Sequence, residues 1–356
     1  MSRILLAYLA TWQPFDLTAL PAEKLTHLCY AFAKVVDGQV VVQKSGDPTL
    51  SDEAYCQQLC AQLQQLKLRN PQLKILISVG GWSADGFSDA ALTPESRELF
   101  SQSVLQFIQR YQFDGVDLDW EYPSNDMASI KARPEDKQNF TLMLASIRQH
   151  LDAQSEREQR ASQDLYLLTI AAGAGQYYLD GVELPQVAAQ CDFINLMTYD
   201  FYNGWATNAG HHANLYTAAH DPDADSADRA VRLYLANGVS ADKIVLGCPF
   251  YGRSLRGVAA PGLGAAGTPK SNGTYSYQQI ATELLPSGRY IRHWDAAAQV
   301  PWLYSGDEFI SYEDAESIAL KGQYVQQHGL AGAMFWEYTE DQSNTLLNAL
   351  WENIQS

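Results

Sequence analysis

The sequence predicts an α/β protein, a (β/α)8 TIM barrel with a small α+β domain inserted between strands 7 and 8. Three observations support this fold: eight short apolar runs, amphipathic stretches between them, and one long interruption near the carboxyl end. A doubly wound parallel sheet is the alternative that such alternation also allows. The predicted strands are Ile4–Ala10, Leu25–Ala33, Leu73–Val79, Gly115–Trp120, Leu165–Ala172, Phe193–Tyr199, Ile244–Phe250 and Gly332–Trp336.

Several stretches between these strands have helical spacing. In Tyr55–Leu68, for example, Leu59, Leu63 and Leu66 fall on one face of a helix. The connection Trp12–Lys24 is too rich in proline for a full helix, so the barrel is expected to be irregular there. The other predicted helices are Ser96–Arg110, Lys137–Leu151, Asp228–Ala236 and Asp314–Gln327.

The interruption is too long to be a plain loop in a compact domain. Gly and Ala dominate Gly257–Gly267, and short strands are expected at Tyr275–Gln279, Tyr290–Asp295 and Phe309–Tyr312 around a helix. We therefore predict an inserted α+β domain. The predicted boundaries are 1–253 with 312–356 for the barrel and 254–311 for the insertion.

The charge balance excludes some partners. With 24 basic and 41 acidic residues the net charge is −17, which disfavours nucleic acid and tolerates a neutral polymer. The His211–His212 pair is the only histidine cluster, and Cys56 and Cys60, one helical turn apart, are poorly placed for a disulfide. We expect no metal and no cofactor.

No run approaches the ~18 apolar residues of a membrane helix, and Met1–Trp12 lacks the pattern of a leader peptide. We expect a monomer without a membrane segment. It would be either cytoplasmic or the mature form of a secreted protein.

The run Asp114–Glu121 carries the chemistry. Side chains alternate along a strand, so Asp117, Asp119 and Glu121 point the same way, and the apolar residues between them point the other way. Like charges in a desolvated site raise at least one pKa, and Glu121 lies at the carboxyl end, where barrel enzymes react. Glu121 is thus a candidate general acid. The alternatives, a solvated acidic turn or a calcium loop, do not explain the alternating apolar residues.

Other strand ends add polar and aromatic groups. Ser78 lies within an apolar strand, and Gly80–Gly81 allows a close approach to the backbone. Asn195, Met197 and Tyr199 share one face of the sixth strand. Tryptophan and tyrosine side chains, which stack on sugar rings, cluster at the same ends. These residues are Trp12, Trp82, Trp120, Tyr122, Trp205 and Trp336.

These motifs resemble glycoside hydrolase family 18, the chitinase family, over nearly the whole chain. The family signature Asp-Gly-x-Asp-x-Asp-x-Glu is complete at Asp114–Glu121. The elements Ser-x-Gly-Gly and Met-x-Tyr-Asp match Ser78–Gly81 and Met197–Asp200. Further similar segments are Asp200–Trp205, Gly210–Tyr216, Pro249–Arg253 and Met334–Trp336.

The resemblance implies a chitinase that cleaves β-1,4 linkages with retention, and in which the substrate's own 2-acetamido group is the nucleophile. Glu121 would be the proton donor, Asp119 and Asp117 would serve the acetamido N–H, and Tyr199 would bind the acetamido oxygen. The partners would be chitin or chitooligosaccharides. The substrate-binding residues implied are Tyr8, Phe32, Gly81, Trp82, Tyr122, Met197, Asp200, Trp205, Tyr251, Arg253 and Trp336.

Two alternatives stay open. An endo-β-N-acetylglucosaminidase would use the same residues on glycoproteins or peptidoglycan. A chitin-binding lectin would be expected to lack the last carboxylate of the signature, whereas Glu121 and Asp119 are both present.

Overall fold

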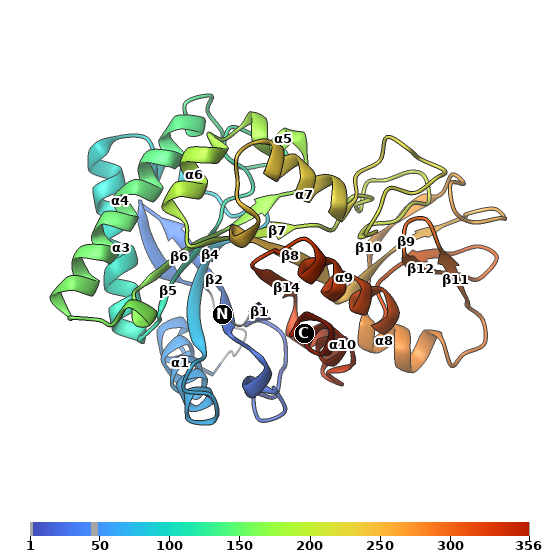
Figure 1. The fold of residues 1–356 in the computed structure, drawn as a ribbon, viewed down its shortest axis with the longest axis horizontal. Helices are drawn as coiled ribbons and strands as arrows, with labels where there is room; N and C mark the ends of the chain where they lie inside the picture. The colour runs from blue at the N-terminus through green and yellow to red at the C-terminus, as the bar shows by residue number, and fades with distance from the viewer. Residues whose placement is uncertain (1–2, 44–48, 356) are drawn as a thin grey trace.

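A closed parallel barrel forms the larger part of the protein, as predicted. The computed structural model describes residues 3–43 and 49–355. The strand order is β1-β14-β8-β7-β6-β5-β4-β2, and β1 also pairs with β2, which closes the ring (Figure 1). The barrel strands are β1 (Ile4–Ala10), β2 (His27–Val36), β4 (Lys74–Gly80), β5 (Gly115–Asp119), β6 (Leu167–Gly173), β7 (Phe193–Met197), β8 (Ile244–Pro249) and β14 (Gly332–Trp336).

Helices cover the outside of the barrel, and each predicted helix is present with ends shifted by a few residues. The connection from β1 to β2 contains only a short 3-10 helix at Ala22–Lys24, as its proline content predicted. The helices are α1 (Asp52–Arg69), α2 (Phe87–Ala90), α3 (Pro94–Tyr111), α4 (Asp136–Arg157), α5 (Gln176–Asp180), α6 (Leu184–Gln190), α7 (Ala227–Ala236), α9 (Ala315–Gln327) and α10 (Thr345–Ile354).

A five-stranded antiparallel sheet lies at one side of the barrel, beyond β8 and α9 (Figure 1). Its order is β10-β9-β13-β12-β11, and it confirms the predicted insertion between the seventh and eighth barrel strands. The boundaries 254–311 stay a prediction, and the first strand of this sheet begins at Tyr251. The strands are β9 (Tyr251–Arg256), β10 (Thr268–Ser276), β11 (Ile291–Asp295), β12 (Val300–Tyr304) and β13 (Phe309–Ser311).

Several elements differ from the predicted ones. The strand predicted at Tyr275–Gln279 is wrong beyond Ser276, because the Ser276 hydroxyl accepts a hydrogen bond from the Gln279 N–H and caps the helix α8 (Tyr277–Gln279). Strand β3 (Gln39–Val42), which forms an antiparallel hairpin with the end of β2, was not predicted, and neither were β9, β12 and most of β10.

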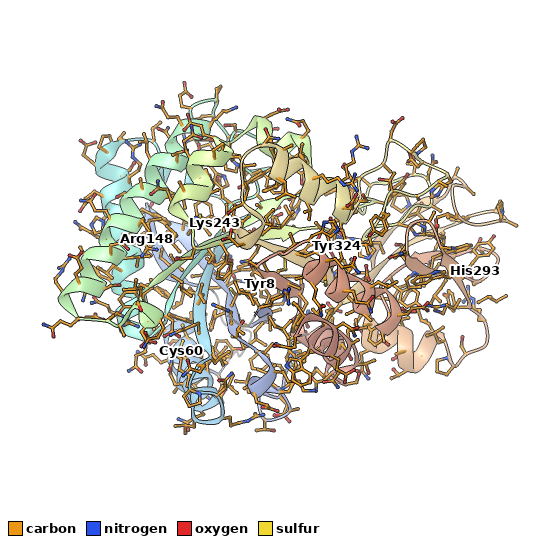
Figure 2. All side chains as sticks on the ribbon, in the orientation of Figure 1. Tyr8, Cys60, Arg148, Lys243, His293 and Tyr324 are labelled. Carbon is orange, nitrogen blue, oxygen red and sulfur yellow. The ribbon has the colours of Figure 1, made fainter. Side chains whose placement is uncertain are left out.

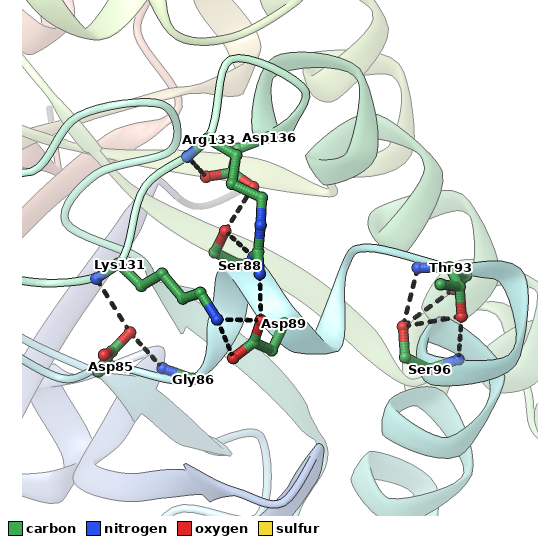
Figure 3. A network of polar contacts seen from close by, with 9 residues as sticks. All are labelled: Asp85, Gly86, Ser88, Asp89, Thr93, Ser96, Lys131, Arg133 and Asp136. Atoms are coloured by element: carbon green, nitrogen blue, oxygen red, sulfur yellow. Dashed lines mark hydrogen bonds and ion pairs between the residues drawn. The ribbon is translucent and has the colours of Figure 1, made fainter.

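Side-chain contacts hold the loops after β4 and β5 together (Figure 3). Asp136 is fully buried and accepts hydrogen bonds from the Ser88 hydroxyl and the Arg133 N–H, both at 2.7 Å. Asp89 pairs with the Lys131 ammonium group at 2.8 Å and with Arg133. These contacts fix the loop that follows the carboxylate strand.

The long loop between β7 and α7 is fastened to the smaller sheet. The Gly267 N–H donates to the Thr207 carbonyl at 2.7 Å, and the Ala209 N–H donates to the Ala265 carbonyl at 2.8 Å. Farther along, the backbone N–H of His212 donates to the Ser311 hydroxyl at 2.9 Å. The loop and the inserted sheet therefore form one continuous wall beside the carboxyl ends of the barrel strands.

The cysteines contribute packing rather than cross-links. Each of the five is buried and free, and the sulfur atoms of Cys56 and Cys60 lie 3.9 Å apart. Within residues 3–43 and 49–355, no helix is both long and apolar enough to cross a membrane.

A buried ion pair joins α9 to the segment after β13 and leads to a stability prediction. The Lys321 ammonium and the Glu313 carboxylate are 2.5 Å apart, and both side chains are almost fully buried. We expect Lys321→Met to lower the free energy of unfolding by about 3–5 kcal/mol in urea titrations, because Glu313 loses its partner in a dry site. The control Arg69→Met breaks a largely exposed pair with Glu23 and should cost less than about 1 kcal/mol. Equal losses in both variants would contradict the prediction.

Candidate active site

Strand β5 and the residues directly after it place three carboxylates at alternate positions, two on the strand and Glu121 two residues beyond its end. Asp117, Asp119 and Glu121 are all at least nine-tenths buried. On the opposite face, Trp120 stacks on Phe87 of α2, with ring centroids 5.4 Å apart. The apolar side chains between the carboxylates thus anchor β5 to the surrounding helices.

Asp117 is the innermost carboxylate, and four strands supply its partners. One oxygen accepts hydrogen bonds from the Tyr8 and Ser78 hydroxyls at 2.9 and 2.8 Å. The other accepts from the Thr169 hydroxyl at 2.6 Å and the Asn195 amide at 3.1 Å. Burial raises the pKa of Asp117, while these four bonds act in the opposite direction. Figure 2 labels Tyr8 near the middle of the barrel.

Asp119 differs from Asp117 in having an unsatisfied oxygen. Within the described residues, the buried Oδ1 atom of Asp119 has no hydrogen-bond partner. Burial, together with the charges of Glu121 and Asp117, raises the pKa of Asp119 well above its usual value. A buried carboxyl oxygen without a partner is costly unless a ligand satisfies it.

Glu121 has the properties of a general acid. Burial raises its pKa to about 7, the charge of Asp200 adds to this rise, and a hydrogen bond with Tyr122 opposes it. A carboxyl group with this pKa carries a proton in a large fraction of molecules near neutral pH. Glu121 can therefore donate a proton and later take one back.

Asp200 follows β7 and is held in its ionised form. Arg253 binds it through two hydrogen bonds, at 2.7 Å from Nε and 2.6 Å from Nη2, and the Tyr251 hydroxyl donates to it at 2.9 Å. Burial alone would raise the pKa of Asp200, but His212 and Arg253 hold it well below its usual value. The His212 Nδ1 lies 3.6 Å from the carboxylate. Asp200 is thus a fixed negative charge beside Glu121.

Aromatic rings from β1, β2 and β14 form a first aromatic wall, made of Tyr8, Trp12, Phe32 and Trp336. Phe32 stacks on Trp336 at 5.5 Å and on Trp12 at 5.8 Å. Tyr8 meets Trp336 at 5.6 Å. Gly81 has a φ of +92°, and a Cβ there would lie 2.6 Å from the Phe32 ring, so no larger residue fits. Met197 and Tyr199 pack against the same cluster.

A second aromatic wall consists of Trp82, Tyr122, Tyr177 and Trp205. Trp82 meets Trp205 at 5.7 Å and Tyr122 at 6.5 Å, and Tyr122 contacts Tyr177 at 5.2 Å. Trp205 is 67% exposed and Trp82 45%, so both rings offer free faces to a ligand. Within the part of the chain that the structure describes, no group of three or more potential ligands could hold a metal ion.

The comparisons with known proteins agree with this geometry. The sequence profile described as Glycosyl hydrolases family 18 matches residues 4–341. The chain belongs to this family. The predicted family and barrel fold are therefore confirmed.

Individual relatives of this family 18 chain carry chitinase or glucosaminidase names. Chitinase A1 of Niallia circulans is 44% identical over 81% of this chain, which spans only 44% of that protein's length. Chitinase 1 of Aphanocladium album is 32% identical, with 98% of this chain and 83% of that protein covered. A solved family 18 N-acetylglucosaminidase from Paenibacillus barengoltzii is similar with a TM-score of 0.90 and 41% identity, covering 99% of this chain and 100% of that one.

Four contributors to this family 18 site were not predicted from the sequence: Trp12, Thr169, Tyr177 and His212. Trp12 was noted as a strand-end aromatic but was not predicted to bind substrate, although it continues the first aromatic wall. His212 was considered only as a metal ligand, whereas its ring packs on Tyr251 at 5.3 Å beside Asp200. The similarity of Gly210–Tyr216 to the family pattern was the sequence feature that could have identified His212 as a site residue.

Proposed function

We propose that this chain is a chitinase, which hydrolyses β-1,4 linkages between N-acetylglucosamine units of chitin and chitooligosaccharides. The observation that carries the proposal is the pair formed by Glu121, with a pKa of about 7, and Asp119, whose buried oxygen has no protein partner. Glu121 supplies a proton donor, and Asp119 supplies an acceptor suited to an amide N–H.

The proposed mechanism is retaining and substrate-assisted. Glu121 protonates the glycosidic oxygen while the carbonyl oxygen of the substrate's acetamido group attacks the anomeric carbon and forms an oxazolinium ion. Asp119 accepts the acetamido N–H and stabilises the positive charge, and Tyr199 donates to the acetamido oxygen. The protonated leaving group departs, and Glu121 then removes a proton from a water molecule that attacks the anomeric carbon, which breaks the bond to the acetamido oxygen and restores the acetamido group. Asp117 is fixed by four hydrogen bonds of its own, and it thereby keeps the segment of β5 that carries Asp119 in position.

The two aromatic walls would bind the sugar rings on either side of the reacting bond. We assign Tyr8, Phe32, Met197, Tyr251 and Trp336 to the ring that is attacked and Trp82 and Trp205 to the leaving-group side, with Gly81 and Tyr122 between them. Asp200 and Arg253 would orient the attacked sugar. We further propose that the chain acts as a monomer without a cofactor, with residues 254–311 as the inserted domain.

The pKa of Glu121 leads to a pH prediction. Because this carboxyl must be protonated to donate, kcat/KM should be at its plateau well below pH 7 and fall about tenfold per pH unit above it. Asp200→Asn removes a charge that raises this pKa, so the alkaline limb should move to lower pH. An alkaline limb of kcat/KM that does not shift in Asp200→Asn, or a kcat/KM that is constant up to pH 9, would contradict the assignment of Glu121 as the proton donor.

A second candidate is an N-acetylglucosaminidase that releases single sugars, because the Paenibacillus barengoltzii enzyme described as an N-acetylglucosaminidase matches the chain over nearly its full length. The product-length profile from chitotetraose, chitopentaose and chitohexaose separates the two. A chitinase should release mainly the disaccharide, whereas the alternative should release only the monosaccharide from every oligomer. Cleavage of a high-mannose glycoprotein, with the chitin oligomers left intact, would contradict both.

A further inference from the structure

A groove on the flank of the barrel has no role in the chemistry above. It lies between the loop after β1 and helix α1, where a regular barrel would have its first helix. Two adjoining hollows of about 560 and 220 Å³ make up this α1 groove, and they share Phe15 and Gln62. The lining residues are Gln13, Pro14, Phe15, Asp16, Leu17, Thr18, Tyr55, Gln58, Leu59, Gln62, Gln65, Leu66 and Arg69.

The part of the α1 groove nearest Tyr55 is uncharged. Pro14 and Phe15 provide apolar surface, Leu59 is buried, and three glutamines provide amide donors and acceptors. In the described part of the chain, no hydrogen bond engages the side-chain amides of Gln13, Gln58 or Gln62. In a chain with a net charge of −17, such a surface suits a neutral ligand that combines hydroxyl and amide groups with flat apolar faces.

The two charged residues of the α1 groove, Asp16 and Arg69, are confined to its other end. Asp16 accepts hydrogen bonds from the backbone and hydroxyl of Thr18 at 2.8 and 2.7 Å. Arg69 pairs with Glu23 at 3.0 Å. The only cation among these lining residues is therefore already paired, so an anionic ligand has no free counter-charge there, and the uncharged end offers none to a ligand of either sign.

The groove adjoins the first aromatic wall along the chain. Trp12, whose ring stacks on Phe32 and is 41% exposed, directly precedes the lining residue Gln13. The Tyr55 hydroxyl donates to the Thr11 carbonyl at 2.6 Å and fixes α1 against this corner. The segment Thr11–Gln13 therefore links the aromatic wall, through Trp12, to the uncharged end of the groove, through Gln13.

We propose that the α1 groove is an additional binding site for N-acetylglucosamine chains, outside the catalytic cleft. The proposal rests on the proposed chitinase function. The lining runs from Tyr55 to Arg69, about 21 Å along α1 at about 1.5 Å per residue, so the groove can hold more than one sugar ring. Binding there holds insoluble chitin on the enzyme and is not needed for oligomers that fill only the cleft.

The test compares polymer and oligomer in one set of variants. The triple variant Phe15→Ala, Gln58→Ala, Gln62→Ala removes the aromatic and amide contacts from the uncharged end. We expect its rate on colloidal chitin to fall about tenfold, while kcat/KM for chitotriose stays within about twofold of the parent. The matched control Gln57→Ala, Leu68→Ala changes exposed positions on α1 that do not line the groove, and it should match the parent on both substrates.

Binding is then measured without turnover. In a Glu121→Gln background, the triple variant should leave more protein unbound on insoluble chitin than the control. Equal binding and equal rates on chitin would overturn the groove proposal while hydrolysis of chitotriose still supports the proposed function. If the parent does not cleave chitotriose at all, the proposed function fails instead. Loss of a dimer in the triple variant, with unchanged chitin binding, would assign the groove to a second copy of this chain and also overturn the proposal.

Discussion

Glu121→Gln should lower kcat on chitooligosaccharides by about 10²–10⁴-fold and leave substrate binding nearly unchanged. The glutamine amide has the same size as the glutamate side chain, but it cannot replace the carboxyl group, whose pKa is about 7, as a proton donor. The loss should be much smaller on an aryl glycoside with an acidic phenol, because that leaving group departs without a proton. Steady-state rates on both substrates, with calorimetric binding of chitotetraose, measure this.

The control for Glu121→Gln lies in the same sequence run. Asp114 accepts hydrogen bonds from Lys67 at 2.5 Å and from the Ile75 N–H at 2.7 Å, at the start of the strand and away from the other carboxylates. Asp114→Asn should therefore weaken the fold and leave kcat within a few-fold of the parent. An equal loss of kcat in both variants would point to general disruption of β5 rather than loss of a proton donor.

Asp119→Asn should lower kcat by about 10²–10³-fold on both substrates, the natural oligomer and the aryl glycoside alike. Asp119 is proposed to orient the acetamido group and to stabilise the charge that develops on it during the attack, and a more acidic leaving group replaces neither contribution. The contrast with Glu121→Gln therefore separates the two roles. Rates on the two substrates, measured in parallel for both variants, provide the comparison.

Ser78→Ala is a milder variant that tests the same part of the site. It removes one of the four hydrogen bonds to Asp117 and leaves Asp119 unchanged, so we expect only a several-fold loss of kcat. A normal rate in Asp119→Asn, or rescue of that variant on the aryl glycoside, would contradict the role given to Asp119.

Much of the fold could be predicted because buried parallel strands read as apolar runs. β3, β9 and β12 were missed as strands because short antiparallel strands depend on pairing partners that local patterns do not contain. Likewise, Tyr275–Gln279 has strand-like composition, yet the cap at Ser276 turns the chain into a helix.

For the site, strand alternation was enough to place Asp117, Asp119 and Glu121 on one face. It could not show that Asp117 has four partners and that Asp119 has an unsatisfied oxygen, because those contacts come from other strands. The position of His212 beside Asp200 depends on how the long loop packs on the smaller sheet, which periodicity does not encode.

The most direct test of the substrate-assisted mechanism changes the substrate rather than the enzyme. An aryl chitobioside whose attacked sugar carries an N-acetyl, N-fluoroacetyl or N-trifluoroacetyl group differs mainly in the nucleophilicity of the amide oxygen. If that oxygen attacks the anomeric carbon, as the unsatisfied Asp119 oxygen beside Glu121 suggests, kcat must fall steeply along the series. A kcat that is nearly independent of fluorination would show that a protein carboxylate or water attacks instead, and would contradict the account.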